Sequence, residues 1–295
     1  MIKYFPALFV VLWSTGFIGA RMGMPYAEPA SFLSLRYVIA IVVLGAIVLV
    51  AGVGTGKAKW PDWRLACHSM VVGVFLHGIY LGAVFWVIDH GFPAGISSMI
   101  IGLQPLVVAF FAGSLLGETV SRRNWQGLLI GLVGLCLVIV PKIEFGTTGI
   151  TPFTVAITVM AMLASTFGTI YQKKYASHVD VRTGTIWQYI GALIPSLIYA
   201  SMFESFSFEW NGELIFALGW LVLVLSIAAV FMLLLLIRDG SVSQVSALFY
   251  LVPTSTAIIA YFLFGETLNM LQLSGMVLCA IGVRFAFAKS NTKSA

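Results

Sequence analysis

Long apolar runs separated by short polar stretches form the main pattern of this chain. Each run holds about 20 residues, which is the length that an α-helix needs to cross a bilayer. Because hydrocarbon offers the backbone no hydrogen-bond partner, such runs are expected to be helical. The predicted helices cover residues 5–22, 31–53, 66–89, 93–116, 122–140, 152–174, 182–203, 213–237, 241–264 and 269–288. The pattern therefore predicts an all-α integral membrane protein with ten transmembrane helices.

The connections between the predicted helices are short. Only residues 89–92 separate the third helix from the fourth, and only residues 117–121 separate the fourth from the fifth. Helices joined by such tight hairpins pack antiparallel to one another. We find no stretch that is long and polar enough to form a separate soluble domain.

One stretch of the chain occurs twice, with every landmark of the second copy 148 positions after its counterpart. The landmarks are Pro105, residues 117–119, Gly127 and Gly134 in the first copy, and Pro253, residues 265–267, Gly275 and Gly282 in the second. Earlier in the chain, Tyr37 matches Tyr189 at an offset of 152, which pairs Arg36 with Gln188. These matches predict an internal duplication, with repeats at residues 1–141 and 142–295.

The distribution of Lys and Arg predicts how the chain is oriented. With the N-terminus in the cytoplasm, the cytoplasmic segments hold 13 of these residues and the opposite side holds only Arg21 and Lys142. Short cytoplasmic loops are enriched in Lys and Arg, so both termini are expected in the cytoplasm. Because each repeat has five helices, the second must cross the membrane in the opposite sense to the first. Such inverted repeats recur in secondary transporters, whose substrate sites lie near mid-membrane.

Composition supports the membrane location and narrows the function. The 295 residues are 60% hydrophobic and 9% charged, whereas soluble domains carry about 25% charged residues. The net charge of +5 does not indicate nucleic-acid binding, because the positive residues are scattered between apolar runs and do not gather on one polar face. The three cysteines form no paired motif. The expected partners are therefore the lipid bilayer and a small-molecule substrate, without nucleic acid, metal or cofactor.

The duplicated residues are similar to a known repeat. Arg36 early in the second helix, Pro105 in the fourth, the Gly-Glu at its end and the spaced glycines of the fifth resemble the EamA repeat of the drug/metabolite transporter superfamily. The stretch 13–17 also resembles EamA-type members. The resemblance implies ten helices, cytoplasmic termini and a place in the cytoplasmic membrane, as in bacteria. It also implies transport of small metabolites, often the export of amino acids.

Polar and aromatic side chains inside the apolar runs are candidate substrate ligands. A cavity of aromatic groups with a few hydrogen-bonding groups suits an amphipathic metabolite. The residues expected to bind substrate are Trp13, Ser14, Thr15, His77, Tyr80, Gln104, Tyr171, Trp187, Gln188 and Tyr250. Each Tyr or Trp alone can instead serve ordinary packing or an interfacial belt, and that alternative stays open.

A second group of residues is expected to act in structure or gating: Arg36, Pro105, Glu118, Pro253 and Glu266. Each proline removes a backbone hydrogen bond and kinks its helix, which gives either a static bend or a flexing point. Each glutamate ends a helix and is expected to cap the helix that follows rather than to carry protons. For Arg36 a structural role is expected, with its side chain extending to the outer surface. Contact with an anionic substrate, or with a carbonyl near the outer gate, is the alternative.

These observations favour a secondary active or facilitative transporter over an enzyme. The expected activity is export of small metabolites such as amino acids across the cytoplasmic membrane by alternating access. A membrane-embedded enzyme is the runner-up, but the four histidines have no metal-ligand spacing. A non-transporting membrane scaffold is the other alternative. The glycines of the fifth and tenth helices allow close helix packing, either within one chain or in a homodimer.

Overall fold

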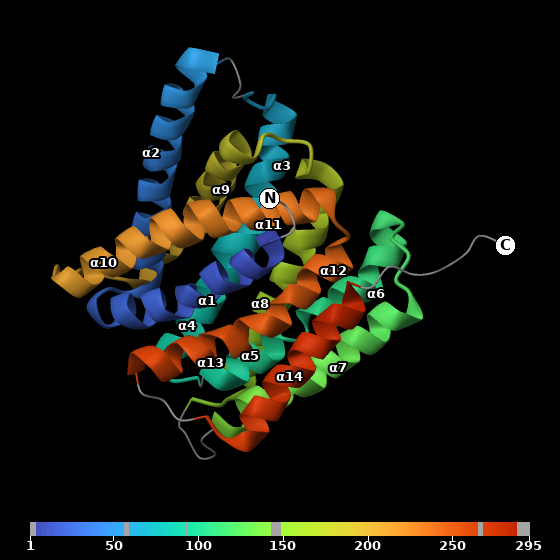
Figure 1. The fold of residues 1–295 in the computed structure, drawn as a ribbon. Helices are drawn as coiled ribbons and strands as arrows, with labels where there is room; N and C mark the ends of the chain where they lie inside the picture. The colour runs from blue at the N-terminus through green and yellow to red at the C-terminus, as the bar shows by residue number, and fades with distance from the viewer. Residues whose placement is uncertain (1–3, 56–58, 93, 143–148, 265–267, 288–295) are drawn as a thin grey trace.

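The computed structural model describes residues 4–55, 59–92, 94–142, 149–264 and 268–287. All regular structure in these ranges is helical, apart from an isolated bridge between Ala27 and Phe208 (Figure 1). The α-helices are α1 (Phe5–Gly23), α2 (Pro29–Thr55), α3 (Trp63–Gly73), α4 (Tyr80–Asp89), α5 (Ala94–Ile101), α6 (Gln104–Leu116), α7 (Arg122–Ile139), α8 (Pro152–Tyr171), α9 (Val181–Phe203), α10 (Gly212–Trp220), α11 (Val230–Asp239), α12 (Val242–Ala247), α13 (Leu251–Phe264) and α14 (Met270–Ala286). The all-α prediction is confirmed.

Several of these helices continue into one another through short π or 3₁₀ segments. The π-helix η3 (Val74–Ile79) joins α3 to α4, and the π-helix η6 (Leu221–Ala229) joins α10 to α11. A further π-helix, η5 (Gln172–Ala176), extends α8, and the 3₁₀-helix η7 (Leu248–Tyr250) joins α12 to α13. The described residues thus form ten helical rods when α5 and α6 are taken together.

Six helices of the described ranges are long and apolar enough to cross a membrane. They are Pro29–Val50, Trp63–Asp89, Pro152–Ala176, Val181–Phe203, Gly212–Asp239 and Val242–Leu263. Three further apolar helices are shorter, at Phe5–Gly16, Gln104–Leu116 and Met270–Ala286. The structure is therefore that of a multi-helix membrane protein, while the full set of ten spans stays a prediction.

The predicted single helix at 93–116 is in fact two helices. Residues 102 and 103 separate α5 from α6, and Pro105 lies in the first turn of α6. A proline in a first helical turn costs no helical hydrogen bond. Pro253 has a related place, three residues into α13 and just after the 3₁₀ turn η7. Pro105 therefore marks the beginning of a helix, whereas Pro253 lies within the continuous rod that α12, η7 and α13 form.

Helices α7 and α14 lie side by side (Figure 1) and meet through glycines. A Cβ placed on Gly134 would lie 2.6 Å from the backbone nitrogen of Cys279. One placed on Gly275 would lie 2.7 Å from the carbonyl oxygen of Gly134. Small residues at this spacing let helix backbones approach closely. The glycines that the two copies share therefore pack against each other within one chain.

Two glutamates connect the α1–α2 loop to the α9–α10 loop. The Glu204 carboxylate accepts hydrogen bonds from the backbone N–H groups of Ala30 (2.8 Å) and Ser31 (2.6 Å), which lie in the first turn of α2. The Glu28 carboxylate accepts one from the backbone N–H of Ser205 at 2.8 Å. A carboxylate at a helix N-terminus satisfies free N–H groups and complements the helix dipole. We call this pair of contacts the Glu28–Glu204 clamp.

Glu118 and Lys173 hold the turn between α11 and α12. Glu118 Oε1 accepts a hydrogen bond from the backbone N–H of Val242, the first residue of α12, at 2.9 Å. Lys173 Nζ donates to the carbonyl oxygens of Ile237 and Gly240, each at 2.8 Å. An anion thus meets the N-terminus of one helix and a cation meets the C-terminus of the other, as the helix dipoles favour.

The helix that Glu118 caps is not the one expected. The N-cap of α7 is Ser121, whose side chain accepts a hydrogen bond from the Asn124 backbone N–H. Glu118 is therefore free to cap α12, which lies 124 residues further along the chain. Its counterpart Glu266 lies outside the described residues.

We expect Gly134→Ala to destabilise the protein more than Gly219→Ala. The added methyl group would overlap the α14 backbone at Gly134, whereas nothing lies within 4 Å of a Cβ at Gly219. Overpacking costs about 1–3 kcal/mol, and Gly→Ala at an open helical site is neutral or stabilising by roughly 0.5–1 kcal/mol. Thermal unfolding of the detergent-solubilised variants measures the difference. Equal melting temperatures would contradict the close glycine packing.

We expect Glu118→Ala to lower the stability by about 0.5–2 kcal/mol, the range for the loss of a helix cap. The pH dependence of the transport that the EamA resemblance implies should stay unchanged, because Glu118 contacts the backbone of Val242. Glu209→Ala, at an exposed carboxylate, is the matched control. Thermal unfolding and flux in vesicles at several pH values provide the two measurements. A Glu118 variant of normal stability that has lost proton coupling would contradict the role of Glu118 as a helix cap.

Candidate functional site

The two π-helices η3 and η6 lie in the middle of two long helical rods and place His77 and Ser226 in the interior. Both residues are buried, and Ser226 follows His77 by 149 positions. In a π segment the hydrogen bonds run from i to i+5, and such segments are frequent at functional sites. The sequence contains no obvious signal for either segment, because apolar residues surround both.

Two tyrosines bind the carbonyl groups of these π segments. The Tyr37 hydroxyl donates to the His77 carbonyl at 2.8 Å, and the Tyr189 hydroxyl donates to the Ser226 carbonyl at 2.5 Å. The two rings stack with their centroids 5.5 Å apart and their planes at 12°. Since Tyr189 is the counterpart of Tyr37 in the second copy, the same contact is made twice with corresponding residues.

Two further hydrogen bonds connect the copies. Arg36 Nε donates to Ser226 Oγ at 2.8 Å, and His77 Nε2 lies 3.4 Å from Gln188 Oε1. Gln188 in turn donates to Gln172 Oε1 at 3.1 Å. We call Arg36, Tyr37, His77, Gln188, Tyr189 and Ser226 the central polar cluster. All six are buried, with Arg36 the most exposed at 7%.

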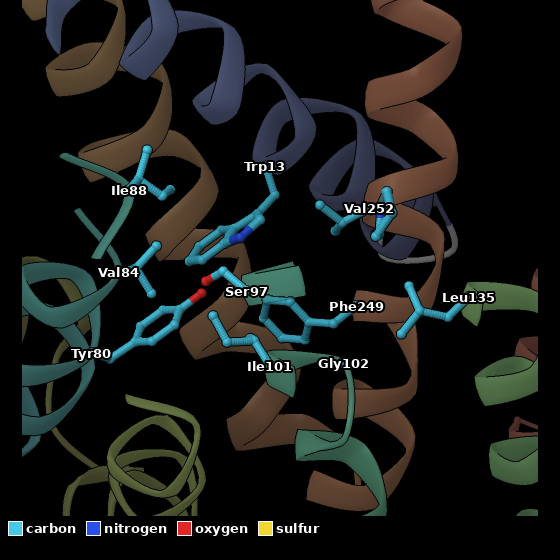
Figure 2. Close-up of a pocket in the computed structure, with 11 residues that line it drawn as sticks. Trp13, Tyr80, Val84, Ile88, Ser97, Ile101, Gly102, Leu135, Phe249 and Val252 are labelled. Carbon is cyan, nitrogen blue, oxygen red and sulfur yellow. The ribbon is translucent and has the colours of Figure 1, made fainter. Parts of the chain in front are cut away.

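Two adjoining cavities lie beside this cluster, and both are bounded by Trp13 of α1 and by Tyr80, Val84 and Ile88 of α4. The Ser97 cavity, of about 60 Å³, is also lined by Phe249, Val252 and Pro253, among other residues. In Figure 2 the rings of Trp13 and Tyr80 project into it from different helices, and the hydroxyl groups of Tyr80 and Ser97 point toward the same region.

The Arg36 cavity, of about 90 Å³, shares Trp13 and Tyr80 with the Ser97 cavity. Arg36 and His77 contribute its polar groups, and Leu221 and Leu225 of η6 belong to its apolar wall. Helices of both sequence copies therefore surround the two cavities. An aromatic and apolar wall with a few polar groups is typical of a site for a small amphipathic ligand.

Of the predicted substrate ligands, Trp13, His77 and Tyr80 line these cavities. Ser14 and Thr15 make other contacts. Ser14 Oγ donates to the carbonyl of Val10 at 2.6 Å and lies 3.2 Å from that of Val252, while Thr15 Oγ1 accepts a hydrogen bond from Trp220 Nε1 at 3.0 Å. These two hydroxyl groups thus connect α1 to helices of the second copy.

The other predicted ligands line neither of the two cavities. Gln104 donates to Thr169 Oγ1 at 3.4 Å, and the Tyr171 hydroxyl lies 2.7 Å from His68 Nδ1. Trp187 meets Trp63 edge-on, and Tyr250 packs against Gly131, where an added Cβ would lie 2.5 Å from its ring. Gln188 belongs to the central polar cluster. The substrate roles of these residues stay predictions.

Among the structural or gating candidates, Arg36 and Pro253 lie at the cavities. Arg36 does not extend to the outer surface as expected, because its guanidinium turns inward to Ser226. Pro105 is buried in the first turn of α6. Glu118 is a helix cap, as described above.

Sequence reasoning missed two residues of the site, Ser97 and Ser226. The Ser97 hydroxyl is buried in the cavity wall without a hydrogen-bond partner in the described part of the chain. Its match with Ser246 at an offset of 149 was the available signal. Ser226 had no such signal, because its counterpart at the same offset is His77, a different residue.

The family model of the EamA-like transporter family matches this chain twice, at residues 4–140 and 152–288. The uncharacterized inner membrane transporter YedA of Escherichia coli (strain K12) is 24% identical over 276 residues, which cover 92% of this chain and 86% of YedA. A probable amino-acid metabolite efflux pump of Salmonella typhimurium is 24% identical over 285 residues, with 94% and 91% covered. Another relative is the uncharacterized transporter YvbV of Bacillus subtilis, 25% identical over 307 residues, with 98% and 92% covered.

A solved crystal structure shares the fold. It superposes with a TM-score of 0.80 at 18% identity, and the match covers 97% of this chain and 96% of that one. The relatives are named as transporters or efflux pumps, and YedA is named as an inner-membrane protein. Together with the apolar helices, these matches identify a multi-pass cell-membrane protein. Because the family model matches both copies and most of the sequence, the chain belongs to the EamA-like transporter family.

Proposed function

We propose that the protein is a secondary active or facilitative transporter that exports small metabolites, amino acids among them, across the cytoplasmic membrane. The two halves, residues 1–141 and 142–295, are inverted five-helix repeats that rock against each other in alternating access. The observation that carries the proposal is the pair of cavities around Trp13 and Tyr80, which helices of both halves surround. In transporters built from inverted repeats, the substrate binds at such an interface.

Corresponding contacts in the two halves support the repeat. Tyr37 binds the His77 carbonyl in the first half, as Tyr189 binds the Ser226 carbonyl in the second. Each half thus builds the same connection between its second helix and the π segment of its third.

The loop contacts support the proposed inverted topology, in which the two termini lie on the same side of the membrane. The Glu28–Glu204 clamp joins two loops that this topology puts outside. Contacts of Glu118 with Val242, and of Thr183 Oγ1 with the Lys59 carbonyl at 2.8 Å, join loops that it puts inside. Each of these contacts pairs loops of the same predicted side.

The size of the cavities supports a mechanism in which the helices separate. Sites for small molecules typically have volumes of roughly 300–1,000 Å³, whereas the two cavities measure about 60 and 90 Å³. A substrate of amino-acid size therefore needs the halves to move apart. Such a movement has to release loop contacts at one end of the molecule while those at the other end hold.

The amino-acid part of the proposal follows from the lining and from one relative. Aromatic and aliphatic walls with Arg36, His77 and Ser97 as polar groups suit a small molecule that is apolar at one end and polar at the other. The Salmonella typhimurium relative is named as a probable amino-acid metabolite efflux pump.

We expect cells that overproduce the protein to release more of at least one small metabolite, amino acids included, than cells with an empty vector. Metabolite profiles of the medium would identify the candidate, and purified protein in vesicles would then be tested for flux of that solute. An inactive Trp13 variant that reaches the membrane is the matched control. If no solute differs between the strains and the vesicles show no flux, the proposed function is wrong.

We expect Trp13→Ala to reduce kcat/KM for transport about tenfold or more, because a large aromatic group in a ligand pocket typically contributes about 2 kcal/mol. Trp210→Ala is the matched control, since Trp210 is 62% exposed and lines neither cavity. Flux in vesicles at equal protein density provides the measurement. Equal losses in both variants would show that Trp13 acts in folding and not at the site.

A further inference from the structure

Arg36 is a buried cation without a carboxylate partner in the described part of the chain. It is 7% exposed and lies seven residues after α2 begins, roughly 10 Å along the helix axis. The structure describes all acidic residues except Glu144 and Glu266, and none of those described forms an ion pair with Arg36. Two other arginines do pair, Arg182 with Asp180 and Arg238 with Asp239.

The guanidinium of Arg36 keeps most of its hydrogen-bonding capacity. A guanidinium has five N–H donors. In the described contacts only Nε–H is used, in the 2.8 Å hydrogen bond to Ser226 Oγ. The four N–H groups of the two terminal nitrogens have no partner among the described contacts, and Arg36 lines the cavity. This pair of nitrogens forms the planar fork that binds a carboxylate with two parallel hydrogen bonds.

The other residues of the cavity walls indicate what kind of ligand would bring a carboxylate to Arg36. The Lys and Asp/Glu side chains of the described ranges line neither the Arg36 cavity nor the Ser97 cavity. A single guanidinium matches one carboxylate better than a doubly charged phosphate. Trp13 and Tyr80 give both cavities aromatic walls, and the Ser97 hydroxyl, buried without a partner in the described residues, lines the Ser97 cavity.

We propose that Arg36 binds the carboxylate of the substrate and that the substrate is an amphipathic monocarboxylate with an apolar side chain between Trp13 and Tyr80. A zwitterionic amino acid and a 2-oxo acid share this chemistry. Ser226 is a positioning residue that holds Nε so that the terminal nitrogens face the cavity. This inference rests on the proposed function, because it assigns the substrate class of the same site.

The copy-to-copy comparison supports this assignment. Gln188 occupies the position of Arg36 in the second copy and contacts His77, the counterpart of Ser226. Both copies thus make a hydrogen bond from this position to the π segment of the other copy. The neutral side chain of Gln188 is sufficient for this structural contact. The positive charge of Arg36 is therefore not needed for the contact and can serve to bind a ligand.

The test measures binding and flux with full-length protein. The probes are L-valine, L-leucine and L-phenylalanine, their methyl esters, their matching 2-oxo acids, and potassium chloride. Binding is measured by calorimetry and by ligand-induced thermal shift in detergent. The proteins are the wild type, Arg36→Gln, Arg36→Lys and Ser226→Ala, with Arg123→Gln as the matched control, because Arg123 lies over the Phe285 ring and lines neither cavity.

We expect the wild type to bind at least one free acid about tenfold or more tightly than its ester, since a hydrogen bond to a charged group is worth roughly that much. Arg36→Gln should weaken the free acid to the level of the ester and leave the ester unchanged. Arg36→Lys, which keeps the charge without the fork, and Ser226→Ala should show smaller losses. Arg123→Gln should bind as the wild type does. The comparison of amino acids with 2-oxo acids identifies which of these two classes of carboxylate the site binds.

Three results would overturn the inference. They are acid binding that Arg36→Gln leaves unchanged, equal weakening of acid and ester in a variant that unfolds at the wild-type temperature, and a wild type that binds chloride but none of the acids. If Arg36→Gln fails to fold, Arg36→Lys and Ser226→Ala decide by the same acid-to-ester ratio. Failure of the proposed function would look different: wild-type vesicles would show no flux of any solute, whatever residue 36 is.

Discussion

The absence of water in the bilayer core is the constraint on which this structure depends, because each backbone group there must find its partner within the protein. The π segments η3 and η6 interrupt the α-helical pattern in the middle of two long rods. The hydroxyls of Tyr37 and Tyr189 supply hydrogen bonds to the carbonyl groups of His77 and Ser226. These contacts fix α2 and α9 to the π segments and bring the two tyrosine rings into a stack at the centre.

The central polar cluster follows from that arrangement. A buried polar group without a partner costs free energy, and each cluster residue that enters the interior therefore needs another beside it. Arg36 meets Ser226 and Gln188 meets His77, so that partners come from different copies of the repeat. The cavities lie next to this rigid cluster, with Trp13 and Tyr80 on helices that pack around it. The site thus combines the hydrogen-bonded polar groups of the cluster with aromatic side chains of α1 and α4.

The apolar runs were sufficient to predict the helical fold and most helix positions, because helix length and backbone satisfaction follow directly from the hydrophobic pattern. The interruption at residues 102–103 was not predicted, since both residues are compatible with a helix and only the start of α6 reveals it. Trp13, His77 and Tyr80 were found from polarity and aromatic character alone. Ser97 and Ser226 were missed because a single serine in a helix usually binds its own backbone, and the match of Ser97 with Ser246 does not by itself indicate a cavity. The cap from Glu118 to α12 could not be derived either, because it joins segments 124 residues apart.

The two copies differ in charge at one position of the central polar cluster, where the first copy has Arg36 and the second has Gln188. The contacts that the copies share belong to the scaffold, and this difference belongs to the site. Tyr37 and Tyr189 do the same work, and so do the paired glycines of α7 and α14. Symmetric contacts of this kind suit a scaffold in which either half can move against the other, since corresponding interactions are available in both. Recognition of a cargo requires no such symmetry, because one substrate has one polar end. The first copy has a guanidinium at this position and the second a neutral glutamine, and this difference puts the cation of Arg36 in the cavity wall.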